Sequence, residues 1–201
     1  MLLGARQFFE RRGAPAGGYV AGYTNMIEAW SPTGTGSQTI QLSEALTPLT
    51  DFTIDGCMTY GGSTTGDSAI LGLNNRTSST FSLWYRNGNA VPRCFATEDS
   101  SNPVATDLTN SPTFCFSIRF NLSALTMTFA RGDLTTTHTF SSSGNWTWAT
   151  AYSQISSGLT VLGMDSARLS DINSIRVYPS ILSDADLLAN HEIDKARFNL
   201  P

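Results

Sequence analysis

The chain has 201 residues, of which 14% are charged, and its formal net charge at pH 7 is −4. This length suits one all-β domain, and a chain poor in charge but rich in Ser and Thr favours short strands over surface helices. The acidic balance excludes the basic field of a nucleic-acid-binding protein, and no apolar run reaches the roughly 18 residues needed to cross a membrane.

Residues 1–18 differ in composition from the rest and form an N-terminal arm and linker. The run MLLGARQFFERR predicts a short helix that ends at Gly13, and residues 14–18 are a flexible linker. Such a helix is marginal alone in water, so it either folds back on its own domain or anchors the chain to another subunit. The candidate anchoring residues are Leu2, Leu3, Arg6, Phe8 and Phe9. The arm lacks the apolar core of a secretory signal.

Residues 19–201 predict one domain of about ten to twelve short antiparallel strands, in which apolar and polar residues alternate. The first two, 19–30 and 38–42, are expected to pair with each other. Asn87-Gly88 is the strongest hairpin turn, and the strands 114–120 and 125–129 form the clearest amphipathic hairpin. The other expected strands are 51–60, 68–73, 80–86, 90–96, 134–140, 159–163 and the closing one, which ends at Tyr178. This succession predicts a β-sandwich.

A helix is expected to follow the closing strand. Ser183 has the chemistry of an N-cap and Asp186 that of its capping-box partner, so the helix should run over 184–197. The residues expected to face the domain are Ala185, Leu188, Ala189, Ile193 and Ala196.

Strand and helix together carry a motif: a strand I-x-x-[IV]-R-[IV]-Y and then L-S-x-x-[ED]-[IL]. The matching residues are Ile172, Ile175, Arg176, Val177, Tyr178, Leu182, Ser183, Asp186 and Leu187, and the ending is Asn190 with 193–198. This motif resembles the closing signature of concanavalin A-like jelly rolls of the laminin-G-like group, and the ending is similar to that of bacteriophage members. The resemblance implies an all-β jelly-roll sandwich of two antiparallel sheets in a phage tail, fibre or capsid-decorating protein.

An aromatic segment, 141–157, is the best candidate for a ligand surface. Indoles stack on the apolar faces of sugar rings, and neighbouring polar side chains bind hydroxyl groups. The glycan-binding candidates are Trp146, Trp148, Tyr152, Asn145 and Gln154. The alternative is that both indoles are core residues of a short strand. A second, weaker candidate consists of Trp84, Tyr85 and Arg86.

Metal binding and cysteine pairing are expected to be absent. Weak calcium candidates in one loop are Glu98, Asp99, Asn102 and Asp107. Asp67, Asn74 and Asn75 form a second group. We favour plain solvated loops, with calcium as the alternative. Cys57, Cys94 and Cys115 are expected to be unpaired thiols of a protein made in a reducing cytosol.

No catalytic constellation is recognisable. The E-x-D motif, Glu192 to Asp194, lies on the expected helix, and His138 and His191 stand beside no nucleophile motif. Arg131-Gly132-Asp133 is adequately explained by turn chemistry.

The sequence therefore predicts a non-catalytic virion accessory protein of a bacteriophage that displays a lectin-like jelly roll to glycans. We expect it to be made in the host cytoplasm, to bind other virion proteins through its arm, and to assemble in several copies. Neither a nucleic-acid partner nor membrane insertion is expected. The alternatives are a bacterial surface or secreted carbohydrate-binding module and, third, a glycan-degrading enzyme.

Overall fold

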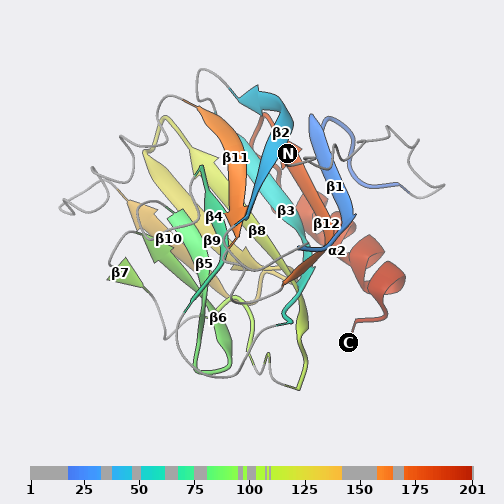
Figure 1. The fold of residues 1–201 in the computed structure, drawn as a ribbon. Coiled ribbons are helices and arrows are strands. Elements are labelled where there is room, and N and C mark those ends of the chain that lie inside the picture. The colour runs from blue at the N-terminus through green and yellow to red at the C-terminus, as the bar shows by residue number, and fades with distance from the viewer. Residues whose placement is uncertain are drawn as a thin grey trace, which may run out of the picture.

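The computed structural model describes residues 18–32, 38–46, 51–61, 68–74, 81–94, 97–98, 103–106, 108, 110–141, 158–164 and 170–200. These residues form two antiparallel sheets of six strands each, packed face to face, and one helix outside them (Figure 1). The predicted two-sheet sandwich is therefore confirmed. Within the described residues, no helical segment combines the length and the apolar character that a bilayer crossing requires.

The first sheet, sheet A, has the strand order β1-β12-β3-β8-β9-β10. Its strands are β1 (Asn25–Trp30), β3 (Phe52–Thr59), β8 (Thr113–Asn121), β9 (Thr126–Arg131), β10 (Thr137–Ser141) and β12 (Asp171–Tyr178). The second sheet, sheet B, has the order β2-β11-β4-β5-β6-β7. Its strands are β2 (Gln38–Leu46), β4 (Ser68–Leu73), β5 (Phe81–Arg86), β6 (Asn89–Cys94), β7 (Thr97–Glu98) and β11 (Leu159–Met164).

The opening of the chain differs from the prediction. The strand expected from Tyr19 begins only at Asn25, and β1 pairs with β12 in sheet A while β2 pairs with β11 in sheet B. The expected pairing of the first two strands is therefore wrong. Tyr19 and Val20 are not in a strand because their polar groups bind the C-terminal helix instead.

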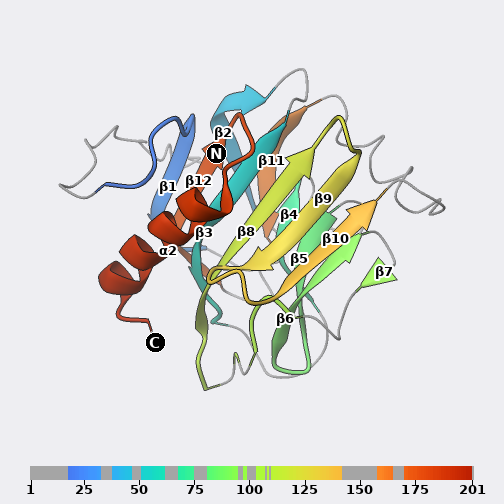
Figure 2. The same cartoon turned by 180° about the vertical axis from the view of Figure 1, so that it is seen from behind.

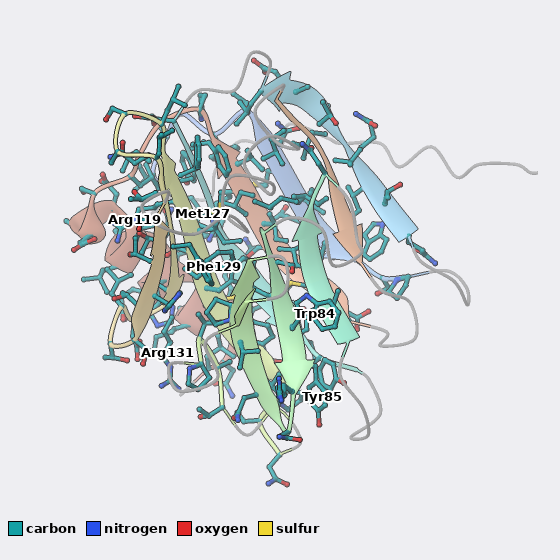
Figure 3. All side chains as sticks on the ribbon, turned by 90° about the vertical axis from the view of Figure 1, so that its left-hand side faces the viewer. Trp84, Tyr85, Arg119, Met127, Phe129 and Arg131 are labelled. Atoms are coloured by element: carbon teal, nitrogen blue, oxygen red, sulfur yellow. A yellow bond between two sulfur atoms is a disulfide. The ribbon has the colours of Figure 1, made fainter. Side chains whose placement is uncertain are left out.

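The core lies between the sheets and consists of the apolar half of each alternating strand. On β8 and β9 the inward residues include Phe120, Met127 and Phe129, all fully buried, and Phe120 stacks on Phe52 with ring centroids 5.4 Å apart. Figure 3 labels Met127 and Phe129 in the space between the sheets. Burying each such side chain contributes about 1.5–3 kcal/mol to stability.

The Asn87-Gly88 turn is confirmed. It joins β5 to β6, with φ at +47° for Asn87 and +84° for Gly88, the positive values that a two-residue type I′ hairpin turn requires. Asn and Gly tolerate this left-handed conformation better than other residues do.

The C-terminal helix α2 (Asp184–Phe198) is confirmed in its position and in its capping box between Ser183 and Asp186. Figure 2 shows it lying across the outer face of sheet A, over β12 and β3. Its expected inner face is wrong: Ala185, Leu188 and Ala189 are exposed. The helix instead buries Leu187, Asn190 and Asp194.

A disulfide lies beneath this helix. Cys57 on β3 and Cys115 on β8 are directly opposite each other, with Cα atoms 4.0 Å apart, and their sulfur atoms are joined. The expectation of three unpaired thiols is therefore wrong. The sequence alone does not predict this pair, because long-range strand pairing sets the register that places Cys57 opposite Cys115.

Candidate functional site

The most highly charged buried region is a cluster between sheet A and α2, which we call the Arg176 cluster: Tyr19, Asp55, Arg176, Asn190 and Asp194. The Arg176 side chain is fully buried. Its Nη2 donates to Asp55 Oδ1 at 2.8 Å and to Asp194 Oδ2 at 2.6 Å, and its Nη1 donates to Asp194 Oδ1 at 3.1 Å. One guanidinium thus joins a β3 carboxylate to an α2 carboxylate.

The neutral members complete the cluster. Asn190 Nδ2 donates to Asp55 Oδ2 at 2.6 Å, while Asn190 Oδ1 accepts from the Val20 amide at 2.8 Å. The Tyr19 hydroxyl donates to Asp194 Oδ1 at 2.6 Å, and the Arg176 guanidinium lies 3.9 Å from the centre of the Tyr19 ring. These contacts explain why residues 19–20 are not part of sheet A. They also explain why Asn190 and Asp194 of α2 face the sheet.

Burial and charge set the protonation of the cluster. Burial raises the pKa of Asp55, against the opposing effects of Arg176 and Asn190. The pKa of Tyr19 rises to about 12, first through burial and then through its hydrogen bond to Asp194. Burial alone would lower the pKa of Arg176, but the two carboxylates outweigh it and raise that pKa. Arg176 is therefore charged and Tyr19 neutral at physiological pH.

The two carboxylates of the cluster do not form an accessible acid pair. Asp194 is fully buried and Asp55 is 5% exposed, and Arg176 binds both. Buried charges without such a partner are strongly unfavourable, so the pairing explains how they are tolerated. We therefore assign the cluster to holding α2 and residues 19–20 against sheet A.

Most of the predicted site residues fall outside the described part of the chain. These are Leu2, Leu3, Arg6, Phe8, Phe9, Asp67, Asn75, Asp99, Asn102, Asp107, Asn145, Trp146, Trp148, Tyr152 and Gln154. Glu98 lies in β7, but its side chain also falls outside the described part. Their predicted roles in anchoring, glycan binding and calcium binding stay predictions.

Asn74 fixes the start of β11. Its Nδ2 donates to the Gly158 carbonyl at 2.5 Å, and its Oδ1 accepts from the Thr160 amide at 2.8 Å. The Asn74 amide also donates to the Val161 carbonyl at 2.9 Å. Because its side-chain oxygen is engaged in this way, Asn74 does not suit the calcium alternative. It instead binds the backbone at the start of β11.

The second predicted ligand surface is divided between two sides of sheet B. Tyr85 lies in the core, 2% exposed, and stacks on Tyr60 at 4.5 Å, so its candidacy for ligand contact is wrong. Trp84 points to the opposite side, is half-buried, and donates from Nε1 to Ser82 Oγ at 2.7 Å. Figure 3 shows both labelled on β5. Trp84 therefore remains a candidate on the outer face of sheet B.

A pocket of about 130 Å³ lies beside α2. Four separate parts of the chain line it: residues 104–106, the start of β8, the turn 131–133 between β9 and β10, and α2 through His191. Leu200 closes one side. The sequence contained no local signal for this pocket, because its walls come together only in the folded sandwich.

Charged and aromatic residues give the pocket its chemistry. Arg131, Asp133 and His191 provide the titratable groups, and Phe114, a core residue that is 7% exposed, also lines the pocket. Burial lowers the pKa of His191 despite the opposing effect of Asp133, so the imidazole is neutral at pH 7. Hydrogen bonds from Thr135 overcome the effect of burial and lower the pKa of Asp133, so this carboxylate is ionised.

One group of potential metal ligands occurs in the part of the chain that the structure describes. It consists of Cys57, Cys115 and Asp194, whose ligand atoms lie within 4.8 Å of one another. The two sulfur atoms are joined as a disulfide and supply no thiolate. The Asp194 carboxylate already forms an ion pair with Arg176. These residues therefore do not fit a metal ion.

Comparison with solved structures confirms the concanavalin A-like fold. The CBM40 of the Ruminococcus gnavus IT-sialidase bound to α2,3-sialyllactose matches with a TM-score of 0.53 at 16% identity, over 84% of this chain and 98% of that one. The same module bound to α2,6-sialyllactose matches with a TM-score of 0.55 at 14% identity, over 85% and 100%.

A botulinum neurotoxin also matches. Its serotype D binding domain in complex with N-acetylneuraminic acid gives a TM-score of 0.53 at 13% identity, over 89% of this chain but 44% of that one. Our chain thus spans less than half of the toxin domain. No family model and no curated protein matches the sequence.

Proposed function

We propose that the protein is a non-catalytic carbohydrate-binding module that recognises sialylated glycans. The observation that carries the proposal is the match to a complete sialyllactose-bound module, over 98–100% of its length. The described residues are compatible with this role, because they offer a small polar pocket beside α2 and a half-buried indole, Trp84, on sheet B.

The predicted place in a bacteriophage particle, with residues 1–18 as the anchor, remains a prediction. It depends on the resemblance of the closing segment, whose Arg176 and Asp194 attach α2 to sheet A. None of the solved structures named above is a virion protein. The alternative of a carbohydrate-binding module therefore has the better support.

Titration calorimetry of the whole chain with α2,3-sialyllactose, α2,6-sialyllactose and lactose tests the binding role. We expect both sialylated sugars to bind and lactose, which lacks the acidic unit, to give no measurable heat. Equal binding of all three would contradict recognition of the acidic unit, and no binding of any would overturn the proposal.

The non-catalytic part has its own test. The protein is incubated with either sialyllactose, and free sialic acid is measured by chromatography against a buffer control. We expect no release above the control. Release that scales with protein concentration would instead identify a glycan-degrading enzyme.

A further inference from the structure

The pocket beside α2 is small. Its volume is about 130 Å³, whereas pockets that enclose drug-sized ligands have roughly 300–1,000 Å³. It therefore suits the terminal unit of a glycan, with the rest of the chain outside.

Arg131 has donors available at the edge of this pocket. Its Nε lies 3.9 Å from Asp133 Oδ1, and no described residue accepts a hydrogen bond from its terminal nitrogens Nη1 and Nη2. Two parallel guanidinium N–H groups match the geometry of a carboxylate. The edge of the pocket thus offers a carboxylate-binding group that the fold itself does not use.

Asp133 offers the complementary acceptor. The Thr135 amide and hydroxyl both donate to Asp133 Oδ1, at 3.1 Å and 2.7 Å, which fixes the carboxylate. Its Oδ2 accepts no hydrogen bond from the described residues. A ligand hydroxyl can therefore donate to Oδ2 without displacing a protein contact.

His191 forms a fixed wall of the pocket. A Cβ atom placed on Gly132 would lie 2.6 Å from His191 Nδ1 and 2.7 Å from Cys115 Cβ, so the imidazole packs directly on the glycine backbone. Nδ1 is buried without a hydrogen-bond partner among the described residues. This packing leaves the rest of the ring as an uncharged surface of the pocket.

We infer that this pocket, rather than the outer face of sheet B, takes the terminal acidic sugar. The sugar carboxylate accepts from the Arg131 guanidinium, and a sugar hydroxyl donates to Asp133 Oδ2. This inference rests on the proposed function and adds the site and the residues that select for acid. A sugar without a carboxylate leaves the guanidinium without its strongest acceptor.

Variants at three positions test the site by calorimetry with α2,3-sialyllactose. We expect Arg131→Met to weaken binding at least about tenfold, because a charged hydrogen bond contributes about 1.5–3 kcal/mol. Arg131→Lys keeps the charge but not the paired donors, so its loss should be smaller. Arg119→Met is the matched control: Arg119 lies in the same sheet, but on its outer face, where it pairs with Asp184 of α2 at 2.6 Å. It should bind like wild type.

The outcomes separate this inference from the proposed function. Wild-type binding that survives Arg131→Met but is lost in Trp84→Ala would overturn the pocket and leave the carbohydrate-binding role intact. Absence of wild-type binding would overturn both. Circular dichroism melts establish that each variant is folded.

A direct readout comes from the His191 ring. Adding free N-acetylneuraminic acid should shift the His191 Cε1–H proton resonance, whereas lactose should leave it in place; His191→Gln assigns the signal. An unshifted resonance under conditions where calorimetry detects binding would show that the sugar lies elsewhere.

Discussion

Arg176 of β12 and Asp194 of α2 lie 2.6 Å apart between Nη2 and Oδ2, with side chains 0% and 1% exposed. A buried ion pair adds little net stability over well-packed apolar residues, but removal of one partner is costly. The pair therefore fixes where α2 sits more than how stable the sandwich is. It also explains the fully buried arginine of the closing strand.

Arg176→Met should destabilise the fold by about 3–5 kcal/mol, because it leaves two carboxylates buried without their cation. Arg119→Met is the matched control. Arg119 binds Asp184 at 2.6 Å, but the Asp184 side chain is 70% exposed, so the loss should be about 0–1 kcal/mol. Urea denaturation followed by circular dichroism gives both values. Similar losses in the two variants would contradict a special role for burial.

Reduction of the disulfide should destabilise the protein. The bond closes a loop between cysteines 58 residues apart, and constraining an unfolded chain over that length is worth about 4 kcal/mol. The double variant Cys57→Ser, Cys115→Ser should be insensitive to reductant. Thiol titration in denaturant without reductant should find one of the three cysteines reactive, Cys94. Three reactive thiols would refute the pairing.

Asn74→Ala should cost about 2–3 kcal/mol. It removes the side-chain hydrogen bonds to Gly158 and Thr160 and places alanine at a φ of +58°. Asn74→Gly loses the same hydrogen bonds but accepts the positive φ, so its loss should be smaller by about 1 kcal/mol. Urea denaturation compares them, and equal losses would show that the backbone conformation contributes nothing.

His191 should make the fold sensitive to acid. Burial lowers its pKa below the ordinary 6.5, against the effects of Asp133, Glu192 and Asp194 and with that of Lys195. The folded state then binds the proton less tightly than the unfolded chain. Its contribution is complete above pH 6.5 and is lost as the pH falls through the folded-state pKa.

Calorimetric Tm values measured from about pH 7 to about pH 5 should therefore fall more steeply for wild type than for His191→Gln. Parallel curves for the two proteins would contradict the effect of burial on this imidazole.

Local patterns predicted α2 but not its orientation. The capping box of Ser183 and Asp186 is contained in four residues, so the start of the helix could be predicted. The helical spacing of the apolar residues predicts that Leu188 faces the sheet. In the structure Leu188 is 40% exposed, whereas Asn190 and Asp194 are buried. Their partners are far away in sequence: Asp55 lies 135 residues from Asn190. A helical pattern cannot contain that information.

For the candidate site too, local patterns predict one part of the arrangement and long-range packing decides the rest. Strand alternation explains why Trp84 points outward while Tyr85 enters the core. The turn at Arg131-Gly132-Asp133 was expected from its chemistry, but its meeting with His191 follows from the docking of α2. The need for glycine at position 132 likewise becomes visible only when the imidazole is seen against it.

The Tyr19 hydroxyl accepts a hydrogen bond from Arg197 Nη1 at 2.6 Å, so the strand-free start of the described domain touches its last helical turn. The polypeptide consequently enters and leaves the sandwich at neighbouring points. Domains with adjacent ends tolerate insertion into other chains. Residues 18–200 are thus suited to insertion into a surface loop of an unrelated host protein, without forcing the two host ends apart.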